Sequence, residues 1–339
     1  MASPQPPYPL HPSVAARVHP EYAAFYNKYI IDKQQVHLQP VSASRVGGVI
    51  IPGGGPLLPV GKTEDHLIPR TETGGTDPVP VRVFTPAGTP PQQGWGVFLY
   101  FHGGGWVLGN IDTENTVCTN ICNRAGVVVV SVDYRLAPEN PFPAAVHDCW
   151  EALLWLHTPS TISLLNINTR ALSISGSSAG GNLAATLTHK AVLEKASLIH
   201  ISKQILIVPV TDNTATVASN WSWKEFEFTP ALPAPKMLWY RNHYLPDSTE
   251  WTNPEASPLL YSNEDGHWRD LPPAVVIVGE LDVLRGEGEA YAKKLQENGV
   301  KAELHVMKGM PHPFLAMDGV LQAGKDAITY IVEGVKSIN

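Results

Sequence analysis

Residues 173–185 read SISGSSAGGNLAA and contain one G-x-S-x-G pattern, over residues 176–180, with Ser178 at its centre. A strand-like run precedes the pattern and a helix-like run follows it, which is the strand–turn–helix context of a nucleophile elbow. Such a sharp turn needs small residues, and Gly176 and Gly180 let the strand and the helix approach without a Cβ clash. The stretch predicts a serine nucleophile at a helix N-terminus, where developing negative charge is favoured. The alternative, that Ser178 only caps the helix, stands unless partner residues are found.

Strand-like and helix-like segments alternate on both sides of the elbow. The strand-like runs are residues 79–86, 94–104, 127–134, 170–177, 204–210, 272–282 and 300–307. The helix-like runs are residues 21–33, 115–126, 143–158, 179–193, 286–299 and 326–338. This alternation, with apolar β-branched runs such as VVVVSVDY, predicts an α/β fold with a mostly parallel sheet flanked by helices. The length of 339 residues suits a single large domain over residues 1–339.

The segment from about 212 to 257 interrupts the alternation. It is irregular, punctuated by proline and rich in aromatic residues, namely Trp221, Trp223, Phe226, Phe228, Trp239, Tyr240, Tyr244 and Trp251. One interpretation is an ordinary helical insertion. We favour a cap over a substrate pocket, because ligand sites in such sheets lie beyond the carboxyl ends of the strands, where this insertion begins. Trp106, Trp221, Trp223 and Phe226 are the residues we expect to line that pocket.

Composition excludes several classes of protein. The net charge is −7 and no basic stripe is present, so a nucleic-acid partner is not expected. No apolar run reaches the roughly 18 residues that span a membrane, and the first residues do not resemble a signal peptide, so we expect a cytoplasmic protein. The cysteines lack the spacing of a disulfide framework or a zinc site and are expected to be buried: Cys118, Cys122 and Cys149. A homodimer is compatible with the sequence, which does not define an oligomeric state.

A serine nucleophile needs backbone N–H groups directed at the tetrahedral oxygen. Residues 101–106 read FHGGGW and follow a strand-like run, as the glycine-rich oxyanion loop of a hydrolase does. The expected donors are the N–H groups of Gly104, Gly105 and Ala179. Gly103 is the nearest alternative. His102 precedes the nucleophile in the chain, so we expect it to fix the loop by a hydrogen bond and not to act as the base.

The order serine, then acid, then histidine along the chain directs the search for the remaining partners. A late strand-like run ends in GELDVLR, which offers Glu280 and Asp282. Asp282 stands further into the loop and is the expected acid, with Glu280 as an ion-pair partner or a supporting group. His312 lies in the loop GMPHPF after the last strand and is the expected base, since His305 lies within that strand. No metal or organic cofactor is required by a Ser178, Asp282, His312 triad.

Five ordered motifs give the chain a resemblance to the hormone-sensitive-lipase-like branch of the α/β-hydrolases: HGGGW, DYRLAPENPFPAA, GSSAGGNLAA, GELDVLRGEGEAYAKKL and GMPHPF. The resemblance covers roughly residues 80–335. It implies an eight-stranded sheet, a helical cap built from about residues 1–50 together with the insertion at about 212–257, and esters of short or medium acyl chains as substrates. The residue before the nucleophile is commonly Asp in this branch and is Ser177 here. Within DYRLAPE, Arg135 and Glu139 are expected to form an internal ion pair without a catalytic role.

The leading hypothesis is a serine carboxylesterase that hydrolyses a small-molecule ester with an apolar group through an acyl-enzyme on Ser178. A second hypothesis keeps the triad but changes the bond to an amide, a carbamate or a thioester of a secondary-metabolite pathway. The sequence does not separate these bonds, because the same triad attacks all of them. A third hypothesis is a non-catalytic small-molecule receptor on the same scaffold. Such receptors resemble these enzymes but lack a triad residue, whereas all three are present here.

Overall fold

A single eight-stranded sheet forms the centre of the protein. The computed structural model describes residues 7–46, 52–195, 198–312 and 314–338. The strand order is β1-β2-β4-β3-β5-β6-β7-β8, with β2 antiparallel to both neighbours and parallel pairing from β4 to β8. The strands are β1 Lys62–Ile68, β2 Val79–Thr85, β3 Trp95–Phe101, β4 Val128–Val132, β5 Ile167–Ser177, β6 Lys203–Ile207, β7 Ala274–Gly279 and β8 Ala302–Met307. The expected eight-stranded, mostly parallel sheet is confirmed.

Burial explains which strands the sequence reveals. Every residue of β3, β4, β6 and β7 is buried, as the continuous apolar runs predict for parallel strands covered on both faces. All seven strand-like runs correspond to strands. The eighth strand, β1, has the sequence KTEDHLI, and most of its side chains are at least partly exposed. Among the described strands it pairs with β2 alone, at the edge of the sheet, so no apolar pattern marks it in the sequence.

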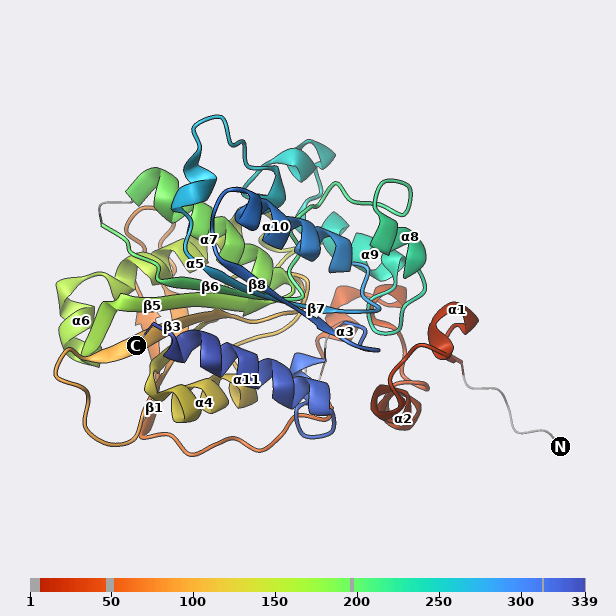
Figure 1. The fold of residues 1–339 in the computed structure, drawn as a ribbon, viewed down its shortest axis with the longest axis horizontal. Coiled ribbons are helices and arrows are strands. Elements are labelled where there is room, and N and C mark those ends of the chain that lie inside the picture. Colours follow the sequence, from red (N-terminus) through yellow and green to blue (C-terminus); the bar gives the residue numbers. More distant parts are fainter. Residues whose placement is uncertain (1–6, 47–51, 196–197, 313, 339) are drawn as a thin grey trace.

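Helices cover both faces of the sheet (Figure 1), with α4 and α11 along one face and α5, α7 and α10 along the other. These helices and the short elements among them are α4 Asn115–Ile121, continued by the π-helical turn η2 Cys122–Gly126, α5 Ala144–Leu156, α6 Pro159–Leu165, α7 Ala179–Lys195, η5 His267–Asp270, α10 Arg285–Glu297, η6 Leu315–Met317 and α11 Gln322–Lys336. The three cysteines are buried in this layered core, as predicted. Within the described residues, no helix combines the length and the apolar character needed to cross a membrane.

The register of the parallel strands brings four loops to one edge of the sheet. Phe101 pairs with Gly176, and Ser177 pairs with Ile207. Further along, Gly279 pairs with Met307. The loops that follow β3, β5, β7 and β8 therefore start at nearly the same level. These are the loops that carry the predicted site residues.

Two segments far apart in the sequence lie beside this edge (Figure 1). The N-terminal one holds α1 Pro12–Ala15, α2 Pro20–Tyr29, η1 Val36–Leu38 and α3 Val41–Ser44. The insertion after β6 holds α8 Trp221–Glu225, α9 Ala234–Tyr244, η3 Ser248–Thr252 and η4 Pro258–Leu260. They meet through an ion pair of 2.8 Å between Arg17 and Glu225 and through stacking of His11 on Phe228 at 4.4 Å.

Candidate active site

The turn between β5 and α7 holds Ser178 in a conformation that few residues other than glycine adopt. Its φ is +57°, and its N–H donates to the carbonyl of Ile207 at 2.8 Å, which ties the turn to β6. A Cβ on Gly176 would lie 2.2 Å from the carbonyl oxygen of Gly180, and a Cβ on Gly180 would lie 1.9 Å from that of Phe101. The small residues of the elbow are therefore required by close backbone approach, as expected from the sequence.

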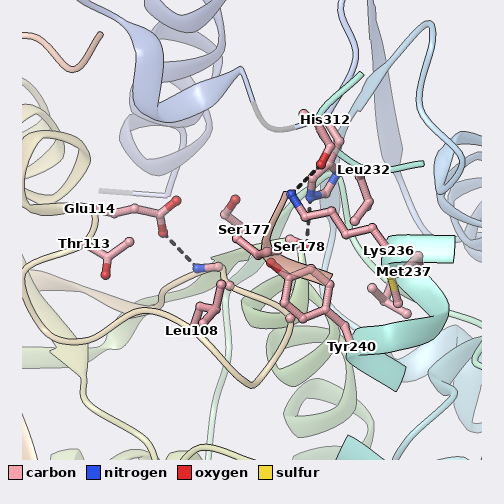
Figure 2. A pocket seen from close by; sticks show the side chains of 16 residues that line it. Leu108, Thr113, Glu114, Ser177, Ser178, Leu232, Lys236, Met237, Tyr240 and His312 are labelled. Atoms are coloured by element: carbon pink, nitrogen blue, oxygen red, sulfur yellow. Dashed lines mark hydrogen bonds between the residues drawn. The ribbon is translucent and has the colours of Figure 1, made fainter. Parts of the chain in front are cut away.

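Ser178, His312 and Asp282 form a continuous hydrogen-bonded chain. The Ser178 Oγ lies 2.9 Å from His312 Nε2, and His312 Nδ1 lies 2.8 Å from Asp282 Oδ2 (Figure 2 shows the first contact). With its proton on Nδ1, the imidazole donates to Asp282 and accepts from the serine hydroxyl. Asp282 is fully buried, and its Oδ1 also accepts from the N–H of Leu284 at 3.0 Å. The geometry is that of a nucleophile, a base and an acid that orients the base.

The rejected alternatives have other contacts. Glu280 accepts from Lys308 at 3.2 Å and from the N–H of Gly309 at 2.8 Å, so it is the ion-pair partner that we expected and it fixes the turn before His312. His305 lies within β8, and its ring stacks on Tyr330 of α11 at 3.9 Å.

The glycine loop after β3 presents free N–H groups. Gly104 and Gly105 have φ of +125° and +62°, and in the described part of the chain their N–H groups have no acceptor. The N–H of Ala179 is at the first residue of α7, where a helix offers no internal acceptor. The N–H of Gly103 is already taken by a carboxylate, so this alternative donor is not available. Gly104 and Gly105 border the space above Ser178, and Ala179 is the residue directly after Ser178 at the start of α7.

His102 is part of the framework of this loop. Its side chain is buried, its Nδ1 donates to the carbonyl of Gly103 at 2.6 Å, and its ring stacks on Tyr134 at 4.3 Å. Burial lowers the pKa of His102 to about 4, so the ring is neutral at pH 7. This agrees with the predicted role as a hydrogen-bonding residue.

The sequence did not indicate Glu114, which lines the cavity over Ser178. Its side chain is only 4% exposed, and its Oε2 accepts from the N–H of Gly103 at 3.1 Å and from the hydroxyl of Tyr100 at 2.9 Å. Burial raises the pKa of Glu114 to about 7, although these hydrogen bonds oppose the shift. No motif marks this residue, because it is a single glutamate in the irregular stretch between the glycine loop and α4.

The cavity over Ser178 has a volume of about 160 Å³. Its apolar walls come from the body and from both outer segments, namely Val36, Leu108, Val210, Leu232, Met237 and Tyr240. Figure 2 shows Thr113 and Glu114 on one side of Ser178, and Lys236, Met237 and Tyr240 on the other. Lys236 is the only lysine or arginine among the described lining residues, and its Nζ donates to the carbonyl of Ala231 at 2.7 Å. Burial lowers the pKa of Lys236 to about 8.

The aromatic residues expected to line the pocket do not border this cavity: none of Trp106, Trp221, Trp223 and Phe226, all of them described, is among its lining residues. Trp106 is fully buried and stacks on Tyr244 at 4.3 Å. Trp223 is fully buried and donates to Glu287, while Phe226 is buried beneath the guanidinium of Arg17. Trp221 is 47% exposed and lies against Arg285. Trp106 and Trp223 thus join the insertion to the body, Phe226 joins the insertion to the N-terminal segment, and Trp221 lies at the surface.

The predicted ion pair between Arg135 and Glu139 was wrong. Arg135 is bound to the buried Asp148 of α5 at 2.8 Å, and Glu139 is bound to Arg45 of the N-terminal segment at 2.9 Å. Each side chain therefore connects the loop after β4 to a different element.

The arrangement provides nucleophilic chemistry at a carbonyl group. It combines a polarised serine, a base held by a buried acid, and N–H donors for an oxyanion. Among the described residues, no group of three or more His, Cys, Asp and Glu side chains is placed to hold a metal ion.

Sequence relatives of the chain include proteins named for ester hydrolysis. The AB hydrolase superfamily protein C1039.03 of Schizosaccharomyces pombe is 48% identical over 94% of this chain and 93% of its own length. An ethyl acetate hydrolase of Pseudomonas putida is 32% identical over 76% of this chain and 78% of its own length. An arylesterase of Saccharolobus solfataricus is 34% identical over 77% of this chain and 79% of its own length.

Solved structures and a family profile agree with these relatives. A fungal esterase from Rhizomucor miehei superimposes with a TM-score of 0.84 at 29% identity and covers 95% of this chain and 97% of its own. The carboxylesterase EstE1, cloned from a metagenomic library, gives a TM-score of 0.75 at 35% identity and covers 83% and 90%. The profile described as alpha/beta hydrolase fold matches residues 98–316, which is more than half of the chain. The chain therefore belongs to the α/β-hydrolase family, in its hormone-sensitive-lipase-like carboxylesterase branch.

Proposed function

We propose that this protein is a serine carboxylesterase whose catalytic residues are Ser178, His312 and Asp282. The observation that carries the proposal is the hydrogen-bonded chain from Ser178 Oγ through His312 to the buried Asp282, at 2.9 Å and 2.8 Å. A helix-capping serine needs no such chain.

The geometry supports a two-step reaction. Ser178 Oγ attacks the ester carbonyl carbon while His312 Nε2 takes the hydroxyl proton, and Asp282 stabilises the resulting imidazolium. The oxyanion accepts hydrogen bonds from the N–H groups of Gly104, Gly105 and Ala179. His312 then gives the proton to the departing alkoxide, and the acyl group remains on Ser178 as an ester. A water molecule deprotonated by His312 attacks this ester, which releases the acid and restores the serine.

The cavity supports substrates with a short or medium apolar group. A closed cavity of about 150 Å³ accepts a benzene-sized molecule, and the space over Ser178 is about 160 Å³ with mostly apolar walls. The relatives named ethyl acetate hydrolase and arylesterase agree with small acyl or aryl esters.

The outer segments complete the proposed site. In this proposal residues up to about 50 and about 212–257 form the cap of a single-domain enzyme, because Val36 from the first and Leu232 and Met237 from the second line the cavity. Residues 1–6 and 47–51 of the predicted cap lie outside the described residues. The cytoplasmic location and the homodimer stay predictions.

The test is an assay of the purified protein on p-nitrophenyl esters from acetate to palmitate. Turnover of the short and medium esters is expected for the wild type, and its loss is expected in Ser178→Ala. Matched amide and thioester substrates with the same acyl group separate the alternative bonds, and faster turnover of one of these would replace the ester proposal. A wild type inert on all of them, but able to bind an ester analogue, would favour the receptor hypothesis.

A further inference from the structure

Glu114 occupies a position from which it can control the oxyanion loop. It is the residue before α4, and it borders the cavity together with Ser178 and Gly105. Its Oε2 accepts from two donors that lie on the same stretch of chain, the hydroxyl of Tyr100 in β3 and the N–H of Gly103 just beyond it. The carboxyl group is therefore a direct contact of the loop that supplies the oxyanion donors.

The contact with Gly103 fixes the loop immediately before those donors. A hydrogen bond to an ionised carboxylate is stronger and shorter than one to a neutral acceptor, so it holds the peptide plane between His102 and Gly103. The next two residues are Gly104 and Gly105, and glycines restrict their own backbone angles least of all residues. The orientation of their N–H groups therefore depends on what holds the preceding plane.

The described side chains that interact with the carboxyl group are mostly neutral ones. The groups that face it are Tyr100 of β3, Cys118 of α4, Tyr134 after β4, Ser177 of β5 and His312 after β8. The Ser177 hydroxyl and His312 both act to lower the pKa of Glu114, and His312 is the group that becomes a cation during the reaction. A carboxylate here thus supports both the N–H groups that meet the oxyanion and the imidazolium that forms with it.

We propose that Glu114 is a positioning residue for ester hydrolysis, and that its ionised form holds the oxyanion loop in the active arrangement. The inference rests on the proposed function. Because burial raises the pKa of Glu114 to about 7, the carboxylate is lost on mild acidification. Protonation then replaces an ionic acceptor with a neutral one at Gly103. Turnover on the acid side should consequently depend on two protons, one on His312 and one on Glu114.

The first test compares the pH dependence of kcat and KM in the wild type and in Glu114→Gln. In the wild type, the slope of log kcat against pH on the acid side is expected to exceed one, the value for a single proton. In the variant the slope should fall to one. At pH 8 the variant should lose kcat on the order of tenfold, less than the loss of a whole oxyanion donor, with little change in KM. Equal profiles and equal kcat in the two proteins would overturn the proposal.

A matched control separates positioning from general loosening of the fold. Glu151 is also a buried carboxylate that accepts from the backbone of a loop, at 2.8 Å from Thr71 and 2.7 Å from Thr73, but it does not border the cavity. Glu151→Gln should lower the melting temperature and leave the steep acid limb in place. If it also removed the second proton, the effect of Glu114 would be a general one and the proposal would fail.

A second variant covers the case in which Glu114→Gln does not fold. Tyr100→Phe removes one hydroxyl donor to Glu114 and keeps the ring. The pKa of Glu114 should therefore rise, and the steep part of the acid limb should move to a higher pH than in the wild type. An unchanged limb would overturn the proposal. The rate at which a fluorophosphonate labels Ser178 gives the same pH readout without ester turnover. A wild type that labels with the two-proton profile but cleaves no ester would refute the proposed substrate and retain the role of Glu114.

Discussion

Replacing Gly105 with alanine is expected to remove most ester turnover while leaving the protein folded. Gly105 has φ of +62°, where an L-residue is less stable by about 1–2 kcal/mol. A Cβ at this position would lie 2.3 Å from Cδ1 of Tyr240, so either the ring or the loop must move. Tyr240 belongs to α9 and is itself buried, and displacement of the loop carries the Gly105 N–H away from the oxyanion.

The size of the effect follows from the loss of one donor. Removal of a single oxyanion donor lowers kcat by about 10²–10³, or about 3–4 kcal/mol of transition-state stabilisation. KM should change much less, because the N–H group contacts the charge that develops in the transition state. The free energy of unfolding should fall only by the strain of the left-handed residue together with the local displacement of Tyr240.

The assay measures kcat and KM on p-nitrophenyl butyrate beside urea unfolding. Gly126→Ala is the matched control, since Gly126 has φ of +67° and a Cβ there would meet nothing within 4 Å. The Gly126→Ala variant should have a lower free energy of unfolding, because of the backbone strain, and should keep the kcat of the wild type. A Gly105→Ala protein with wild-type kcat, or a Gly126→Ala protein with the same loss of kcat, would refute the role given to the Gly105 N–H.

Three further predictions concern a triad residue, a buried carboxyl group and the cavity wall. Asp282→Asn should lower kcat by about 10⁴, because an amide favours the wrong tautomer of His312; on p-nitrophenyl butyrate, a loss below about tenfold would contradict the assigned acid. Glu287 is buried, and burial followed by the charge of Asp212 raises its pKa to about 8, so the folded protein keeps a proton that the unfolded chain releases near pH 4.5. The free energy of unfolding therefore falls between pH 4.5 and 8, and at 1.36 kcal/mol per unit the fall due to Glu287 is about 5 kcal/mol. Glu287 is still half protonated in the folded protein at pH 8, so urea unfolding at pH 5 and pH 8 should show a fall smaller by about 3–4 kcal/mol in Glu287→Gln. Equal falls would mean that Glu287 is already ionised in the folded protein. Lys236→Met should lower kcat/KM for a p-nitrophenyl hemisuccinate about tenfold relative to the butyrate, since a partly buried ion pair contributes about 1–2 kcal/mol; an unchanged ratio would show that Lys236 does not meet the acyl group.

The arrangement of the triad could be predicted because it depends on short motifs and a simple topology. Ser178 is marked by the glycines around it, and Asp282 and His312 each follow a recognisable strand. Parallel strands place the loops at their carboxyl ends on one edge of the sheet. The hydrogen bonds of 2.9 Å and 2.8 Å that join the three residues agree with that expectation.

The lining of the cavity could not be predicted in the same way. The insertion has no regular period along its length, so the sequence does not reveal which way each aromatic ring points. Trp223 and Phe226 are directed into the contacts that hold the insertion in place, and the neighbouring Leu232 and Met237 face the cavity instead. The role of Glu114 could not be predicted for a related reason, since only the folded loop brings its carboxyl group to Gly103.

The polar edge strand β1 shows a third limit. Its residues alternate only weakly, and Leu67 is 69% exposed while Ile68 is buried. A strand held at the edge by backbone pairing alone needs few apolar side chains. The resemblance implied eight strands, whereas the residues themselves indicated seven.

The cavity is built from loops of the sheet and from two outer segments, and this bears on how the enzyme could acquire new substrates. The reacting groups stand on loops of the sheet, whereas Leu232, Lys236 and Met237 come from the insertion. Exchange of those three wall residues alters the shape and the charge offered to a substrate and leaves the chemical step intact. Tyr240 also lines the cavity but cannot be exchanged as freely, because its ring packs against Gly105, an expected oxyanion donor. An evolving lineage can therefore vary its substrate range at three positions on the wall, whereas a change at Tyr240 also affects the reaction.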